Sequence, residues 1–178
     1  MPALEKITQK NFLAYKAVRL WALQDAPGAF GSTYERESQF TDSEWLQRAA
    51  NLSSHRAVGY LSTDKGLLCG IAGAFQDEHD PLQATLVSMW VAPAYRRSGN
   101  GRALVSAILA WARAHSMGML RLTVTANNSA AIAFYERNGF SFTGKTEPYP
   151  NDPSLVEREM SQSLAPAPIL ATQQTLAS

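Results

Sequence analysis

Apolar residues recur with a helical period at two places near the N-terminus. Residues 11–25 carry apolar side chains at intervals that bring them to one face: Leu13, Ala17, Leu20 and Trp21. This spacing predicts a helix that ends before Pro27, which cannot continue it. Asp42 is a candidate N-cap for a second helix, which we expect to run to about residue 51.

Three runs that are typical of strands follow, at residues 56–63, 67–75 and 84–91. The first two are separated only by Asp64-Lys65-Gly66, which predicts a tight hairpin turn. We therefore expect the middle of the chain to form an antiparallel meander.

The second half of the chain alternates between the two periods. The expected elements are a helix at 99–116, a strand at 120–125, a helix at 129–138 and two closing strands at 140–143 and 156–163, with a turn-rich stretch at 147–153. A strand–helix–strand crossover over residues 84–125 implies one parallel strand pair. The order of elements predicts an α/β protein with a mixed sheet and no internal repeat.

Composition is compatible with one globular domain. Of the 178 residues, 46% are hydrophobic and 17% are charged, which excludes a disordered chain, a collagen and a disulfide scaffold. The single cysteine, Cys69, cannot form an intramolecular bridge or a zinc site alone, so we expect no metal site and a reducing, cytoplasmic setting. No apolar run is long enough to span a membrane, and we expect no membrane partner.

The net charge of +1 conceals an uneven distribution of charge. Residues 81–135 contain no Asp, Glu or Lys but hold five arginines: Arg96, Arg97, Arg102, Arg113 and Arg121. This segment indicates a site for a concentrated anion. A nucleic acid would require a wider basic face, so a small polyphosphate ligand is the better interpretation.

An Arg-x-x-Gly-x-Gly turn lies in the middle of this segment, between a strand and the best predicted helix. Its fixed positions are Arg96, Gly99 and Gly101. A helix N-terminus offers unpaired N–H groups and a partial positive charge, and glycines let a phosphate approach the backbone. The turn lacks the Lys-Ser/Thr of a P-loop and the third small residue of a dinucleotide fingerprint. A tight turn with solvated arginines is the alternative.

Residues 89–104 resemble the acetyl-CoA-binding motif of the GNAT superfamily of N-acetyltransferases, as found in bacterial members. Residues 128–140 are similar to the second motif of that family, with Asn128, Tyr135, Gly139 and Phe140 at its characteristic positions. The resemblance covers roughly residues 4–163. It implies a twisted, mostly antiparallel sheet flanked by helices, with one parallel strand pair that splays apart.

The resemblance also implies a binding mode for acetyl-CoA. Backbone amides of the turn would hold the pyrophosphate, the pantetheine arm would pair with the strand before it, and a backbone N–H of Trp90 or Val91 would face the thioester carbonyl. The implied binding residues are Met89, Trp90, Val91, Arg96, Arg97, Ser98, Gly99, Asn100, Gly101, Arg102, Ala103, Asn128 and Tyr135.

Tyr135 matches the position of the general acid that protonates the CoA sulfur, with a core tyrosine as the alternative. The general base is open, because residues 83–91 hold no carboxylate. Residues 30–37 resemble a segment at the acceptor entrance of many bacterial members, where Glu35 is the candidate for binding or deprotonating the amine. An exposed helix carboxylate is an equally good interpretation of Glu35. The candidate acceptor-binding residues are Phe30, Ser32, Tyr34 and Tyr149.

The leading hypothesis is an acetyl-CoA-dependent N-acetyltransferase with a domain at residues 1–163, whose acceptor is a primary amine of a small molecule, peptide or protein. Attack would be direct, within a ternary complex, because no residue is a credible covalent nucleophile. A non-catalytic acyl-CoA-binding sensor or interaction module is the alternative. Residues 164–178 are uncharged, and we expect a flexible or partner-docking tail that is compatible with a homodimer.

Overall fold

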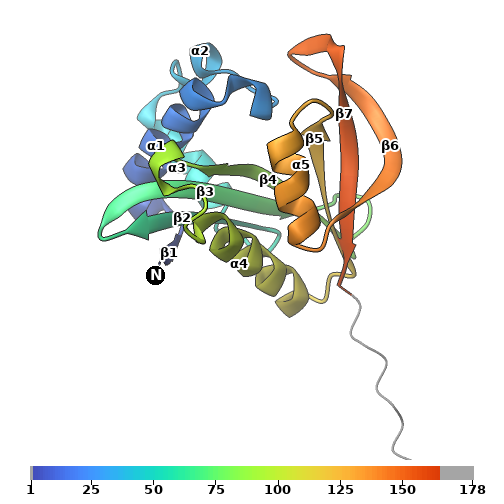
Figure 1. The fold of residues 1–178 in the computed structure, drawn as a ribbon. Coiled ribbons are helices and arrows are strands. Elements are labelled where there is room, and N and C mark those ends of the chain that lie inside the picture. Colours follow the sequence, from blue (N-terminus) through green and yellow to red (C-terminus); the bar gives the residue numbers. More distant parts are fainter. Residues whose placement is uncertain (1, 165–178) are drawn as a thin grey trace, which may run out of the picture.

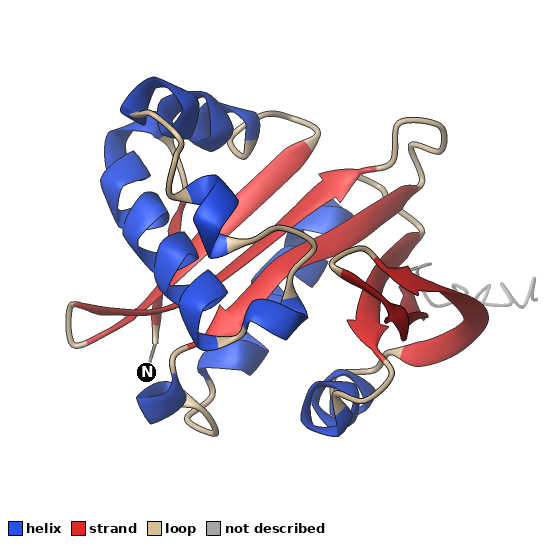
Figure 2. Ribbon diagram, turned by 90° about the horizontal axis from the view of Figure 1, so that it is seen from above, coloured by secondary structure: helices blue, strands red, loops and turns tan. Residues whose placement is uncertain are grey.

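A single seven-stranded sheet runs through the computed structural model, which describes residues 2–164. The strands are β1 (Ala3–Lys6), β2 (Ala57–Asp64), β3 (Leu67–Gln76), β4 (Gln83–Val91), β5 (Met119–Thr125), β6 (Ser141–Tyr149) and β7 (Asp152–Ser163). They lie in the order β1-β2-β3-β4-β5-β7-β6, and every neighbouring pair is antiparallel except β4 and β5. The predicted α/β fold, with its mixed sheet and one parallel pair, is confirmed. Figure 2 shows how strongly the sheet twists.

Helices cover both faces of the sheet. They are α1 (Phe12–Asp25), α2 (Tyr34–Glu37), α3 (Asp42–Asn51), α4 (Asn100–Ala114) and α5 (Ser129–Arg137). The alternation of side chains along β3 separates two cores. Ile71 packs in the cluster formed with α1 and α3, whereas Ala72 packs in the cluster formed with α4. Figure 1 shows α1 to α3 on the N-terminal side of the sheet and the β6–β7 hairpin at the opposite end.

Three local expectations were wrong. Thr41, and not Asp42, is the N-cap of α3, since its side chain and that of Glu44 form a reciprocal capping box. The strand β1 was not predicted, because its four residues are mostly exposed and carry no alternating pattern. Residues 147–153, expected as a turn-rich stretch, are mostly extended, because β6 and β7 continue through them and only Pro150 and Asn151 form the turn.

The first residue of the expected tail packs against the domain. Leu164 is buried, and its N–H donates to the carbonyl of Gly118 at 2.8 Å. The rest of the expected tail, residues 165–178, lies outside the described residues. Within the described part of the chain, no helix has the length and apolar character needed to cross a membrane. The same part shows no group of three or more His, Cys, Asp and Glu side chains that could hold a metal.

Candidate active site

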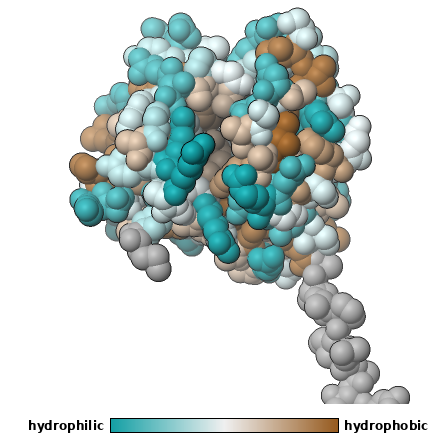
Figure 3. Space-filling model, viewed as in Figure 1, coloured by the Kyte–Doolittle hydropathy of each residue, from teal (hydrophilic) through white to brown (hydrophobic). Residues whose placement is uncertain are grey.

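The parallel strands β4 and β5 stay paired for only three residues. Gln83, Ala84 and Thr85 pair with Met119, Leu120 and Arg121, and the strands part beyond that point. A cleft of about 450 Å³ opens there, lined on one side by residues 86–89 of β4 and on the other by residues 122–125 of β5. Figure 3 shows the surface hollowed at this place, between the α1–α2 side and the hairpin side. The splayed pair thus leaves polar backbone along the wall of an open cleft.

Strand β4 carries a bulge where it borders the cleft. Its register against β3 shifts between the pairs Gly73–Val87 and Ile71–Trp90, and Ser88 in between has a φ of 57°. A positive φ is a strained conformation for a residue with a side chain. The bulge keeps Ser88 and Met89 on the cleft wall.

The side chains of Trp90 and Val91 are buried away from the cleft. The Trp90 ring packs edge-on against Trp21, with 4.9 Å between the ring centroids, and its indole N–H donates to Asp25 at 2.9 Å. Of the three β4 residues expected to bind the acyl donor, only Met89 therefore presents its side chain to the cleft. Any contact from the other two would come from the backbone.

The turn at the end of β4 opens into α4 as the sequence predicts. Gly99 is the N-cap with a φ of 88°, a left-handed conformation that favours glycine. No side chain caps the helix, and the first internal bond of the helix runs from Ala103 N–H to the Gly99 carbonyl at 3.0 Å. The N–H groups of the first turn thus stay available to an anion. A Cβ on Gly101 would stand only 3.1 Å from the Phe134 ring, so this turn packs closely against α5.

Two residues of the turn fix its shape through their side chains. Asn100 is only 2% exposed, and its amide accepts from Ser62 at 2.5 Å and donates to Ser98 at 2.7 Å. The Arg96 guanidinium pairs with Asp25 of α1 and donates to the Val91 carbonyl at 2.9 Å.

Arg97 and Arg102 are exposed and have no ion-pair partner within residues 2–164. They remain as the free cations near the N-terminus of α4. The countercharge expected from the turn is therefore carried by these two residues, while Arg96 is already paired.

Helix α5 places Asn128 and Tyr135 on the cleft wall. The side-chain oxygen Oδ1 of Asn128 caps α5 by accepting from the Ala131 N–H at 3.2 Å. Burial raises the pKa of the Tyr135 hydroxyl, so this group keeps its proton at neutral pH. Its hydroxyl makes no hydrogen bond to another residue within residues 2–164.

On the part of the cleft wall that α2 forms, the glutamate that lines the cleft is not the one expected. Glu35 is exposed on α2 and does not line the cleft, whereas Glu37, two residues later, lines it and is only 1% exposed. Burial alone would raise the pKa of Glu37, but hydrogen bonds and charge from Arg19, and then Arg48 and Ser32, outweigh it and hold the pKa below its ordinary value. Glu37 is thus an ion-pair partner and a poor proton acceptor.

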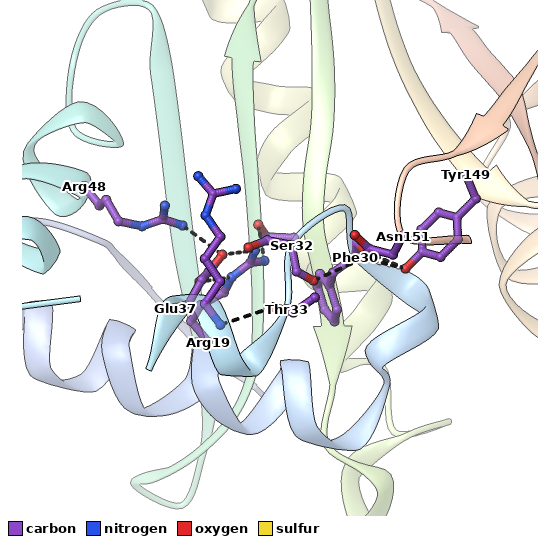
Figure 4. A network of polar contacts seen from close by, with 10 residues as sticks. Arg19, Phe30, Ser32, Thr33, Glu37, Arg48, Tyr149 and Asn151 are labelled. Carbon is purple, nitrogen blue, oxygen red and sulfur yellow. Dashed lines mark hydrogen bonds and ion pairs between the residues drawn. The ribbon is translucent and has the colours of Figure 1, made fainter. Parts of the chain in front are cut away.

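A buried network joins this glutamate to the bulge in β4 (Figure 4). Arg19 of α1 donates from Nε and Nη2 to the two oxygens of Glu37 at 2.9 and 2.8 Å. Its Nη1 donates to the Ser88 hydroxyl at 3.0 Å, and its guanidinium lies 4.8 Å from the centroid of the Phe30 ring. One side chain therefore ties α1, the loop before α2, α2 and β4 together.

Of the four candidate acceptor-binding residues, Phe30 and Ser32 line the cleft, whereas Tyr34 and Tyr149 do not. Tyr34 packs at the edge of the core beneath α1 and α3. Tyr149 is buried in the hairpin, and its hydroxyl donates to the Phe30 carbonyl at 2.6 Å, where the Asn151 amide also donates at 2.9 Å. Figure 4 shows this contact bridging the hairpin and the loop.

The sequence analysis missed a second carboxylate on the cleft wall. Glu157 of β7 lines the cleft and pairs in register with Thr125 of β5 and Glu147 of β6. Its own burial, and then the charge of Glu147, raise the pKa of Glu157 above its ordinary value. It has no ion-pair partner within residues 2–164.

Comparison with known proteins assigns the chain to a family. The model of the acetyltransferase (GNAT) family matches residues 16–140. The chain belongs to the GNAT family of acetyltransferases. An Escherichia coli relative, [ribosomal protein bS18]-alanine N-acetyltransferase, is 42% identical over 120 residues, which cover 66% of this chain and 75% of that protein.

Two further comparisons define how far this likeness reaches. Mouse N-acetyltransferase family 8 member 3 is 31% identical over 99 residues, or 53% of this chain and 43% of that protein, so the chain spans less than half of that relative. An N-acetyltransferase from Thermoplasma acidophilum, solved in complex with coenzyme A, superposes with a TM-score of 0.70 at 14% identity, covering 92% of this chain and 99% of that one. This last match shows the GNAT fold.

The residues present in this GNAT chain fit acetyl-CoA, the acyl donor of the family. The uncapped first turn of α4, with the exposed Arg97 and Arg102 beside it, suits the negative charge of a pyrophosphate. The splayed strand edge then leads from this end of β4 into the cleft that Asn128 and Tyr135 line.

Proposed function

We propose that the protein is an acetyl-CoA-dependent N-acetyltransferase that acts on a primary amine by direct attack in a ternary complex. The observation that carries the proposal is the parting of β4 and β5 beyond Thr85 and Arg121, next to the open N-terminus of α4. This arrangement provides an extended strand edge and an anion site in one line. The family match supports the same activity.

Acetyl-CoA, when bound, would supply an acetyl group activated as a thioester. The N–H groups at the start of α4, with Arg97 and Arg102, would hold its pyrophosphate, and the free edge of β4 and the Asn128 side chain would orient its pantetheine arm. The bulge at Ser88 and Met89 would direct the β4 backbone into the cleft where the amine attacks.

Two side chains on the cleft wall suit the proton transfers. Glu157 would accept a proton from the incoming ammonium or amine, since its raised pKa makes it a better base than an ordinary glutamate. Tyr135 would donate its hydroxyl proton to the sulfur. The amine nitrogen forms the amide bond as the carbon–sulfur bond breaks, so the products are an N-acetylated amine and a thiol.

Glu37 does not suit the role of base, although it is the more deeply buried carboxylate. Its two oxygens already accept from Arg19, and protonation would leave that guanidinium without its partner. Cys69 does not suit the role of nucleophile, because it is buried beside Ser62 and Asn100 and does not line the cleft.

A thermal-shift titration with acetyl-CoA, followed by a thiol-release assay with a panel of amines, tests the proposal. A ligand at a hundred times its dissociation constant adds about 2.7 kcal/mol to the free energy of unfolding. We expect the Arg102→Glu variant to lose most of this stabilisation. Arg113→Glu is the matched control, since Arg113 is exposed at the far end of the same helix.

The two parts of the assay separate the competing functions. Stabilisation by acetyl-CoA together with amine-dependent thiol release would support the acetyltransferase. Stabilisation without thiol release from any amine would favour the non-catalytic acyl-CoA-binding module. No stabilisation in the wild type, or an equal loss in both variants, would contradict a binding site at the start of α4.

A further inference from the structure

A second hollow lies beside the active-site cleft. It has a volume of about 230 Å³, and it shares Arg48, Val87 and Ser88 with the wall of the cleft. Most of its other lining is apolar and comes from β3, α1, α3 and the segment after β1: Ile7, Tyr15, Leu52, Ile71, Ala72 and Gly73. Asn51 is the remaining polar residue on its wall. A mostly apolar hollow of side-chain size therefore adjoins the cleft at the bulge in β4.

Arg48 stands at the junction of the two hollows. Its guanidinium lies 5.3 Å from the centroids of both the Phe40 and the Trp45 rings, which fix the plane of the group. Its only ion pair among the described residues is a loose one, from Nη2 to Glu37 at 3.5 Å. Its Nε is buried and has no hydrogen-bond partner within residues 2–164.

The wall of the cleft near Arg48 carries more positive than negative side chains. Arg19 already donates two hydrogen bonds to Glu37, so Arg48 is a surplus cation in this buried group. Arg36 adds a further cation to the same wall, and Glu157 is the remaining carboxylate that lines the cleft. A planar guanidinium that is partly exposed and whose ion pair with Glu37 is loose is suited to a carboxylate.

We propose that the acceptor is an α-amino acid with an apolar side chain, whose carboxylate binds Arg48 and whose side chain enters the second hollow. The inference rests on the proposed acetyltransferase activity and specifies its substrate class. The three groups of such an acceptor extend from one carbon atom. The places that would receive them are adjacent, because Ser88 and Arg48 each line both the cleft and the second hollow.

Three acceptors with one side chain test the role of the carboxylate: L-leucine, L-leucinamide and 3-methylbutylamine. We expect the wild type to prefer leucine over the other two by about tenfold or more in kcat/KM, because a charge-assisted bidentate pair is lost with the carboxylate. In Arg48→Gln, kcat/KM for leucine should fall to the level of leucinamide. The values for the two analogues that lack the carboxylate should stay within about twofold of those of the wild type. Arg48→Lys should recover only part of the preference, since it keeps the charge and loses the planar fork.

The control for charge is Arg56→Gln, since Arg56 is an exposed cation outside both hollows. This variant should keep the wild-type preference for leucine. A preference of the wild type for one enantiomer of leucine over the other is also expected, because three distinct groups are held at fixed places.

Gly73→Ala tests the second hollow. The added Cβ would lie 3.5 Å from Val87 and 3.6 Å from Leu52, which are ordinary contact distances. Both residues stand on the wall of the second hollow. The variant should therefore fold, and kcat/KM should fall several-fold for leucine but not for alanine.

Each outcome bears on the inference separately from the proposed function. Equal use of leucine and leucinamide by the wild type, or an unchanged preference in Arg48→Gln, would overturn the inference and leave an acetyltransferase of other amines. Failure of all three acceptors, in a protein that acetyl-CoA stabilises and that acetylates peptides or other amines, would overturn it as well. Only the absence of both binding and turnover would contradict the proposed function itself.

Discussion

Two carboxylates line the cleft, and their surroundings shift their pKa values in opposite directions. Arg19 and Arg48 hold the pKa of Glu37 down, whereas burial and the charge of Glu147 raise the pKa of Glu157. A pair of groups whose pKa values are driven apart allows a division of roles. Glu37 stays ionised and orders the arginines, and Glu157 remains available as a base.

Glu157→Gln tests this division. At neutral pH we expect kcat to fall by about a hundredfold, because general-base catalysis typically contributes that much. The activity of the variant should rise toward pH ~10, where the amine loses its proton unaided. The measurement is thiol release as a function of pH, with Glu159→Gln as the control, since Glu159 does not line the cleft.

Glu147→Gln gives a second result from the same profile. Because the charge of Glu147 raises the pKa of Glu157, its removal should lower that pKa and move the acidic limb of kcat/KM to lower pH without loss of the plateau rate. An acidic limb that stays in place in Glu147→Gln, or survives unchanged in Glu157→Gln, would exclude Glu157 as the base.

Tyr135→Phe tests the proposed acid. Tyr135 lines the cleft and its hydroxyl is protonated at neutral pH, so loss of the proposed acid should reduce kcat by about a hundredfold. The dissociation constant of acetyl-CoA, measured by calorimetry, should change little. Tyr60→Phe is the control, since Tyr60 lies on β2 away from the cleft. Unchanged turnover in Tyr135→Phe would leave Tyr135 as a core tyrosine.

At the scale of elements, the bulge in β4 is the feature that most needs support. Ser88 adopts a left-handed backbone conformation in a strand, and its hydroxyl accepts from Arg19, whose position depends on Glu37. The Arg19 side chain thus links β4, on which the acyl donor would lie, to α2, which would border the acceptor. Arg19 lies on the buried face of α1 with Val18 and Ala22. The spacing of apolar residues in the sequence indicated a different face, on which Leu13 and Trp21 are exposed, so it gave no signal for Arg19.

Arg19→Met removes one partner of this buried pair. We expect the free energy of unfolding at pH 7 to fall by about 3–5 kcal/mol, since Glu37 is left as a poorly compensated buried charge. The double variant Arg19→Met, Glu37→Met should recover part of the loss. The measurement is urea denaturation, with Lys16→Met as the control, because the Lys16–Asp42 pair is exposed and contributes about 1 kcal/mol or less.

The pH dependence of stability gives an independent check on the same pair. The folded-state pKa of Glu37 lies below its ordinary value of 4.5, so its contribution is complete above that value and is lost as the pH falls through the lowered pKa. Wild-type stability should therefore decline more steeply below pH ~4.5 than that of Arg19→Met. Parallel declines would show that the pair contributes little.

At the scale of the whole molecule, the cleft divides an N-terminal half from the C-terminal hairpin. The Tyr149 and Asn151 side chains cross between the halves by donating to the Phe30 carbonyl. Residues 119 positions apart in the chain thereby join the loop before α2 to the hairpin, beside the entrance that the proposed acceptor would use. Tyr149 holds Phe30, which lines the cleft, through the backbone of this loop.

Tyr149→Phe should loosen this entrance. The lost hydrogen bond should lower the free energy of unfolding by about 1 kcal/mol. We expect a several-fold higher KM for the amine with an unchanged KM for acetyl-CoA, and faster hydrogen exchange confined to residues 27–33 and the hairpin. An effect no larger than that of Tyr60→Phe on these quantities would contradict the bridging role.

The sequence by itself determined the order of the elements other than β1 and α2, the parallel crossover and the turn that opens α4. These features depend on local periods of hydrophobicity and on glycine at a position with positive φ, and neighbouring residues specify both. The family motifs lie on the same local segments, so Asn128 and Tyr135 reach the cleft as the sequence predicted.

Only the tertiary structure decided which charges are free and which side chains meet. Arg96 and Arg121, which stand in a segment without acids, find partners in Asp25 and Asp77 from distant parts of the chain, and Arg97 and Arg102 remain for a ligand. The insertion of β7 between β5 and β6 brings Glu157 to the cleft, and the bulge in β4 brings Ser88 to Arg19. Such pairings depend on contacts between residues far apart in the chain, and no local pattern of a single sequence encodes them.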